Sequence, residues 1–159
     1  MNEKSSLPRF VGGFSASLGY KNWDLSMLIQ GAAGAVVYIN PESGEIGNFY
    51  EEYAKNRWTP EHQSTTYPRA WNRDNEYWRS QANTFWLRPT DYIRLKNLEI
   101  GYTLPAKINT RFGIQSLRIY ANGFNLLTLD KVKLIDPEVT AGTSYPLQRI
   151  VNLGLTLTF

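Results

Sequence analysis

The sequence contains no cysteine and only one histidine, His62. Without cysteine the chain has neither a disulfide framework nor a thiolate metal site, although this absence says little about its compartment. One imidazole without clustered carboxylates makes a poor zinc site. We therefore expect no metal ion and no cofactor.

Residue patterns that carry catalysis are also missing. The sequence has no nucleophile elbow of the form Gly-x-Ser-x-Gly. Glu51 with Glu52, or Asp136 with Glu138, would be the carboxylate pair of a glycosidase, but neither pair stands in a supporting pattern. The sequence therefore predicts that the protein is not an enzyme.

The charge of the chain is neither large nor concentrated. Its 159 residues include 17 Lys and Arg and 14 Asp and Glu, which are scattered among aromatic residues. A nucleic-acid-binding protein normally gathers its basic residues into one patch. We therefore expect no nucleic-acid partner.

Long apolar runs are absent as well, since none reaches the roughly 18 residues of a transmembrane helix. The first six residues also lack the apolar segment of a signal peptide, so an exported protein with this start is expected to be either a fragment or a chain with a misread start. A membrane barrel is still compatible with the sequence, because its strands alternate apolar and polar residues.

What the sequence does contain is apolar–polar alternation, most clearly in a strand predicted over 147–159. In water an apolar face of this kind rests on a core, whereas in a bilayer it contacts lipid. The alternating stretch has about the 9–11 residues that a tilted strand needs to cross a membrane. Its apolar face consists of Val151, Leu153, Leu155, Leu157 and Phe159.

Four further segments alternate in the same way, and the fold is predicted to be all-β. These strands are expected at 10–20, 23–31, 92–104 and 116–125. Only two residues separate the first pair, which are therefore predicted to be antiparallel neighbours. The alternation changes phase at Lys96-Asn97, which predicts either a β-bulge or a change from loop to membrane face.

Charged and amide side chains recur at the polar positions of these strands. Where the apolar face of a strand contacts lipid, the polar positions line the lumen of the barrel. This role is expected of Arg94, Glu99, Arg118 and Asn152. The alternative for the same residues is a solvated sheet face in a soluble protein.

Two long connections, 32–91 and 126–146, lack strand periodicity and are expected to be loops. They alternate with short connections, as do the outer loops and periplasmic turns of membrane barrels. A short helix is predicted within 47–57 from helical spacing. Aromatic residues in the first loop are expected either to stack on a ligand or to pack the loop onto itself or a partner. The tryptophans considered for such contacts are Trp58, Trp71, Trp78 and Trp86.

Several segments, in this order, resemble SusC/RagA-type TonB-linked outer-membrane proteins. They are 8–14, 19–26, Arg57-Trp58-Thr59-Pro60-Glu61, 67–69, 92–105, 120–126, Asp136-Pro137-Glu138, 145–146 and the terminal Phe159. The resemblance implies antiparallel up-and-down strands, about five of them, that form the C-terminal part of a transmembrane β-barrel. It places the protein in the outer membrane of a Gram-negative bacterium, in contact with lipid. The apolar residues of 151–159 would then be the signal for the barrel-assembly machinery.

The resemblance also implies a function, which belongs to the whole importer rather than to this chain alone. Such importers take up oligosaccharide or peptide ligands together with a SusD-like lipoprotein. TonB supplies the energy through an N-terminal part that this sequence does not include. The alternative is a secreted all-β carbohydrate-binding module that holds glycans with its loop aromatics.

Overall fold

The computed structural model describes residues 5–39, 50–69, 84–109, 113–139 and 145–159. The strands are β1 (Phe10–Tyr20), β2 (Trp23–Ala33), β3 (Val36–Tyr38), β4 (Leu87–Pro89), β5 (Tyr92–Thr103), β6 (Ser116–Asp130) and β7 (Ile150–Thr158). The helical segments are α1 (Glu51–Asn56), the 3₁₀ turn η1 (Thr84–Trp86) and α3 (Ala106–Asn109).

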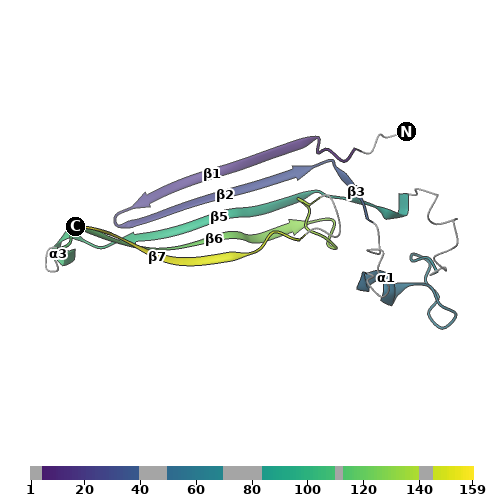
Figure 1. The fold of residues 1–159 in the computed structure, drawn as a ribbon. Coiled ribbons are helices and arrows are strands. Elements are labelled where there is room, and N and C mark those ends of the chain that lie inside the picture. Colours follow the sequence, from purple (N-terminus) through teal and green to yellow (C-terminus); the bar gives the residue numbers. More distant parts are fainter. Residues whose placement is uncertain (1–4, 40–49, 70–83, 110–112, 140–144) are drawn as a thin grey trace.

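Five strands form one antiparallel sheet in the order β1-β2-β5-β6-β7. They lie side by side in Figure 1, and each pairs with the next of the five along the chain. This confirms the predicted antiparallel up-and-down arrangement. β1 and β7 lie at the two edges, and the sheet does not close into a barrel within the described residues.

The strand register contains a bulge, the first of the two alternatives that the sequence predicts. Leu95 and Asn97 of β5 pair with Leu127 and Phe124 of β6, so Lys96 lies opposite two residues of β6. One of these two, Asn125, has a positive φ of 52°. The extra residue lets the strands stay paired beyond the change of phase.

β6 continues through this bulge to Asp130, whereas the sequence pattern placed the end of the strand near residue 125. At the bulge two leucines, 126 and 127, follow each other in the sequence. They interrupt the apolar–polar alternation from which the end of the strand was predicted. β2 likewise runs two residues further than expected, and β7 begins at Ile150 rather than 147.

The two ends of the sheet differ. In Figure 1 the β1–β2 turn, α3 and the C-terminus lie at one end, while β3 and α1 lie at the other. The segment expected to be a long loop therefore holds some regular structure, namely the β3–β4 pair, η1 and the predicted helix, observed as α1. We call the end with the short connections the turn end, and the opposite end the loop end.

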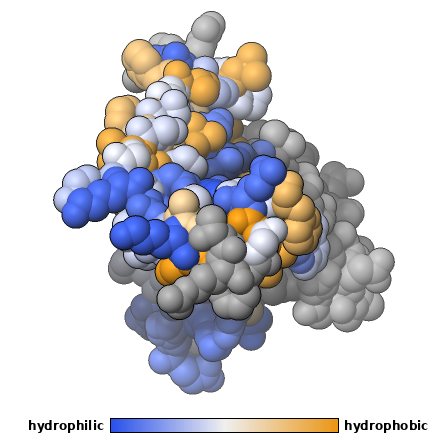
Figure 2. Space-filling model, turned by 90° about the vertical axis from the view of Figure 1, so that its left-hand side faces the viewer, coloured by the Kyte–Doolittle hydropathy of each residue, from blue (hydrophilic) through white to orange (hydrophobic). Residues whose placement is uncertain are grey.

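The described core lies at the loop end and not against the sheet. Ile39, Tyr53 and Val132 are buried together, and partly buried apolar residues of both long connections pack around them. The sheet itself leaves large apolar side chains exposed, including Phe14, Ile119 and Leu153. In Figure 2, which shows the turn end, hydrophobic residues lie at the surface beside hydrophilic ones.

Candidate functional site: the polar face of the sheet

The register separates the sheet into two faces, because side chains along a strand alternate between them. One face, which we call the apolar face, carries Phe14, Leu18, Leu25, Met27, Leu98, Ile100, Ile119, Leu153 and Leu155. The opposite or polar face carries Asp24, Arg94, Glu99, Arg118, Asn122, Thr128 and Asn152. Among the described helices none is long and apolar enough to cross a membrane.

Arg118 is the centre of a network that crosses four strands of the polar face. Its Nε donates to Oδ1 of Asp24 on β2 at 3.0 Å, and its Nη2 to the other Asp24 oxygen. The same Nη2 donates to Oε1 of Glu99 on β5 at 2.7 Å. Asn122 donates to Glu99 at 3.3 Å, and Asn152 on β7 donates to Asn122 at 3.0 Å. The structure thus brings three of the four predicted lumen residues together on one face.

Gly101 makes this network geometrically possible, although the sequence analysis did not identify it. Arg118 on β6 reaches Asp24 on β2 only by passing over the strand between them. A Cβ at Gly101 would lie 2.3 Å from Nη2 of Arg118. Gly154 has a comparable role, because its Cβ would lie 2.4 Å from the ring of Tyr120. A glycine at a polar position of an alternating strand is the signal that could have revealed both.

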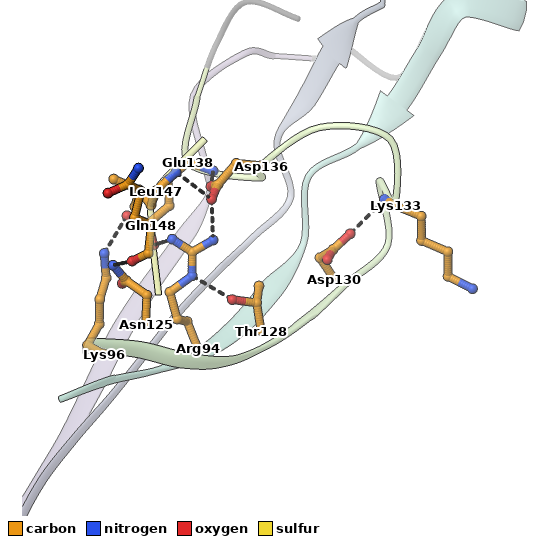
Figure 3. Close-up of polar contacts among 10 residues, drawn as sticks. All are labelled: Arg94, Lys96, Asn125, Thr128, Asp130, Lys133, Asp136, Glu138, Leu147 and Gln148. Carbon is orange, nitrogen blue, oxygen red and sulfur yellow. Dashed lines mark hydrogen bonds and ion pairs between the residues drawn. The ribbon is translucent and has the colours of Figure 1, made fainter. Parts of the chain in front are cut away.

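Arg94, the fourth predicted lumen residue, is the centre of a second network near the loop end (Figure 3). Its side chain is 2% exposed and its Nε donates to Oγ1 of Thr128 at 2.8 Å. Its Nη2 donates to Oδ2 of Asp136 at 2.8 Å. Its Nη1 lies 3.0 Å from Oε1 of Glu138 at an angle that makes no hydrogen bond. Lys96 donates to the other oxygen of Glu138 at 2.6 Å.

This second network joins two segments of the sequence resemblance that lie far apart in the chain. Arg94 and Lys96 belong to the strand motif, and Asp136 and Glu138 belong to Asp136-Pro137-Glu138. The sequence analysis considered these two carboxylates as a catalytic pair without a supporting pattern and predicted no counter-ion for them. The structure shows instead that Asp136 is only 7% exposed, because the segment after β6 folds back over the polar face.

A third contact fixes the loop end of the sheet. Asp91, just before β5, accepts a hydrogen bond from Lys131 at 2.7 Å and one from the backbone N–H of Gly34 at 2.8 Å. The bond from Lys131 and that from Gly34 both lower the pKa of Asp91 below its ordinary value. Asp91 therefore connects the starts of β3 and β5 with the end of β6.

Two of the four predicted loop tryptophans lie in the described residues. Trp86 packs against the buried ring of Tyr53, with ring centroids 5.1 Å apart. Trp58 is half-buried, and its backbone N–H donates to the carbonyl of Pro68 at 3.3 Å. Trp71 and Trp78 lie outside the described residues. The contacts of the first two favour packing of the loop onto itself, and ligand contact stays a prediction.

The aromatic cluster around Tyr53 is tightly connected. Tyr67 and Phe85 pack edge-on against the Tyr53 ring, and Arg88 donates to the Tyr53 hydroxyl at 3.3 Å. Burial raises the pKa of Tyr53, and the hydrogen bond that Tyr67 donates to Glu52 raises the pKa of Tyr67. Both phenols are therefore neutral hydrogen-bonding groups near neutral pH.

Aromatic residues also mark the turn end. Trp23 on β2 packs on Tyr102 of β5 with centroids 4.7 Å apart, and Tyr20 is exposed beside the turn. On β7, each of Val151, Leu153, Leu155 and Leu157 is exposed on the apolar face, and Phe159 follows at the turn end. Aromatics at the rim of an exposed apolar band are typical of membrane barrels.

Comparison with known proteins agrees with this arrangement, although no family model matches the chain. TonB-dependent receptor P26 of Formosa agariphila is 32% identical over 98% of this chain, and receptor P3 of the same organism is 30% identical over 93%. The chain is homologous to the TonB-dependent receptors. It spans 17% and 14% of the length of these two relatives.

Solved structures support the same assignment. The RagAB peptide importer in its 'open-open' state matches 99% of this chain with a TM-score of 0.74 and 29% identity. Its 'closed-closed' state matches with a TM-score of 0.73 and 28% identity. The match covers 18% of the importer chain, so the five-stranded sheet corresponds to a part of that structure.

This homology agrees with two of the sequence-based predictions. TonB-dependent receptors are outer-membrane β-barrel proteins of Gram-negative bacteria. They are receptors and transporters and not enzymes. The present chain is thus homologous to a part of the TonB-dependent receptors and of the RagAB peptide importer.

Proposed function

We propose that the chain forms five consecutive strands at the C-terminal end of the wall of a TonB-dependent importer. The two-faced sheet carries this proposal. Its apolar face exposes Phe14, Leu18, Ile119 and Leu153, which in water would be a large uncovered patch. Against lipid the same residues are stabilised, and the charged networks of the opposite face line an aqueous lumen.

The unpaired edges of the sheet support the same proposal. β1 and β7 each leave a row of backbone N–H and C=O groups without a neighbouring strand in the described residues. Such edges promote aggregation in a free-standing protein. In a membrane they must be paired, because no water reaches them in the hydrocarbon region. Further strands of the same barrel provide that pairing.

The orientation follows from the two ends of the sheet. Short turns of outer-membrane barrels lie on the periplasmic side and long loops outside the cell. The turn end, with Trp23 and Tyr102, would then lie at the periplasmic interface. The loop end, with the Tyr53 core, would lie outside, where a SusD-like lipoprotein is the proposed partner. TonB would act on another part of the receptor.

The proposed cargo is an oligopeptide or an oligosaccharide. The match with the RagAB peptide importer favours peptides. To test this choice, the complete receptor and any lipoprotein that co-purifies with it are titrated in detergent with defined peptide and oligosaccharide mixtures. Saturable binding of one class and uptake of that class by cells are expected. An intact barrel that takes up neither class would contradict the importer function.

The terminal strand supplies a second test of the proposal. If Val151, Leu153, Leu155, Leu157 and Phe159 form the assembly signal, deletion of Phe159 reduces insertion into the outer membrane but not synthesis. Insertion is followed by heat-modifiable migration on gels, with Asn152→Ala on the opposite face of β7 as the control. Equal insertion of the deletion variant and the parent protein would exclude this role for Phe159.

Alanine substitutions distinguish the two roles considered for the loop tryptophans. Trp86→Ala is expected to loosen the loop core and thereby to reduce uptake and protease resistance together. A ligand contact at Trp58, Trp71 or Trp78 would instead reduce uptake while the protease resistance of the folded receptor stays unchanged.

A further inference from the structure

We propose that Arg94 and Lys96 form a carboxylate-binding site on the polar face, which Glu138 fills in this structure and a carboxylate of the cargo takes over. This proposal rests on the proposed function, because it requires cargo in the lumen. The residues involved are those of the second network, whose contacts are described above.

The guanidinium of Arg94 is the first observation. It is nearly completely buried, yet only two of its three nitrogens donate hydrogen bonds, to Thr128 and Asp136. The third, Nη1, has no hydrogen-bond partner among the described residues, although Oε1 of Glu138 is 3.0 Å away. A buried guanidinium nitrogen normally has a partner, so this corner of the site is incompletely satisfied.

The two carboxylates of the network are held unequally, and this is the second observation. Asp136 accepts a hydrogen bond from the side chain of Arg94. It also accepts hydrogen bonds from the backbone N–H groups of Glu138 (2.9 Å) and Leu147 (3.3 Å). Among the described residues the carboxylate of Glu138 contacts side chains only, namely Lys96 through a hydrogen bond of 2.6 Å, Nη1 of Arg94 at 3.0 Å and the hydroxyl of Tyr92, and it is 20% exposed. Asp136 is therefore a fixed part of the site, while Glu138 is the group that can exchange.

When Glu138 moves away, the guanidinium of Arg94 and the ammonium of Lys96 remain, and their positive charges determine which class of ligand can bind. A guanidinium and an ammonium that converge on one carboxylate bind anionic oxygen strongly, since charge-assisted hydrogen bonds are the stronger ones. A cargo carboxylate can approach Nη1 of Arg94 at an angle that allows a hydrogen bond. The Glu138 side chain does not make this bond. An acidic side chain or a terminal carboxylate of a peptide has the required chemistry.

Exchange at this site would also change the loop core. Glu138 lies at one end of residues 131–139, which we call the strap. At the other end of the strap, Val132 is buried with Ile39 and Tyr53. The carboxylate site on the polar face is therefore connected to the core at the loop end by one short segment. Release of Glu138 should increase the mobility of the strap.

The experiment uses the complete receptor in detergent and two short peptides with blocked termini, identical except for glutamate or glutamine at one position. Binding is measured by titration, and strap opening by hydrogen exchange of the strap amides. We expect the glutamate peptide to bind roughly 5–10-fold more tightly than the glutamine peptide, because it gains charge-assisted hydrogen bonds in a partly solvated site. We also expect faster strap exchange with the glutamate peptide only.

Substitutions test which residues cause the preference for the glutamate peptide. Glu138→Gln weakens the internal competitor and should increase the preference for the glutamate peptide, whereas Arg94→Gln should abolish it. Lys96→Gln, at a less buried position, should reduce the preference and serves if Arg94→Gln does not assemble. Lys133→Gln is the matched control, because it removes a charge from the same strap but its side chain points away from the network in Figure 3.

Equal binding of the two peptides to the wild-type receptor, or strap exchange that neither peptide changes, would overturn the proposal. A preference that survives both Arg94→Gln and Lys96→Gln would also overturn it. Failure of the proposed function looks different, because the receptor would then fail to form a heat-modifiable barrel or to take up any cargo.

Discussion

Replacing Gly101 by alanine is expected to break the ion pairs that cross β5. The added Cβ would lie 2.3 Å from Nη2 of Arg118 and 2.6 Å from its Cζ and Nε. Non-bonded heavy atoms approach to about 3.5 Å, so the guanidinium must move by about 1 Å. Its hydrogen bonds to Asp24 and Glu99 at 3.0 and 2.7 Å do not tolerate such a displacement.

The expected loss in the free energy of unfolding is moderate, because these side chains are partly solvated. Arg118, Asp24 and Glu99 are 27%, 45% and 32% exposed. Ion pairs of this exposure contribute about 0.5–1 kcal/mol each, so two broken pairs cost about 1–2 kcal/mol. The loss of unfolded-state entropy on replacing glycine offsets about 0.4–1 kcal/mol of that cost. A net destabilisation of about 1 kcal/mol is expected.

Gly19 provides the matched control. It lies on β1 directly opposite Asp24, and a Cβ there meets nothing within 4 Å. Gly19→Ala should therefore be neutral or slightly stabilising. Urea unfolding of the complete receptor in detergent micelles, followed by tryptophan fluorescence, compares the two variants. A difference of about 1–2 kcal/mol in the free energy of unfolding is expected between them.

A double-mutant cycle identifies the cause. In an Arg118→Gln background the shorter side chain does not lie over Gly101, so Gly101→Ala should cost nothing. The same cost with and without Arg118 would refute the reasoning, because the effect would then come from the β5 backbone and not from the crossing side chain.

Two further predictions concern the loop end. Asp91→Asn removes a carboxylate whose folded-state pKa is lowered. Its stabilising effect is present above the ordinary pKa of about 3.9 and disappears as the pH falls through the lower folded value. The difference in unfolding free energy between wild type and variant should therefore shrink below about pH 4, and a pH-independent difference would contradict this. Tyr53→Ala empties the loop core and should cost about 3–5 kcal/mol locally, seen as rapid proteolysis of 50–69 while β5 and β6 stay protected. Unchanged resistance of that segment would show that Tyr53 does not hold it.

The strands were predictable because a strand at a lipid or solvent boundary shows its two faces in the sequence. The alternation of β1, the phase change at Lys96 and the sharing of one face by Glu99, Arg118 and Asn152 all follow from a side-chain period of two. The end of β6 was missed because the bulge at Asn125 interrupts that period.

The partners of the charged residues were not predictable, because they depend on how a loop folds back. Nothing in the local pattern of Asp136-Pro137-Glu138 indicates that Arg94, some forty residues earlier, becomes its counter-ion. Crossing contacts such as that of Arg118 with Asp24 need the register of three strands and a glycine in the middle one. Only the tertiary arrangement supplies both.

The central claim is that one face of this sheet contacts lipid and the other lines the lumen. Nitroxide labels placed singly at Leu117, Arg118, Ile119, Tyr120 and Ala121 of β6 in the membrane-embedded receptor test it most directly. Labels at Leu117, Ile119 and Ala121 should be relaxed mainly by oxygen in the bilayer, and those at Arg118 and Tyr120 by a water-soluble nickel complex. The opposite assignment of oxygen and nickel accessibility to these positions, or accessibility that does not alternate from residue to residue, would contradict this claim.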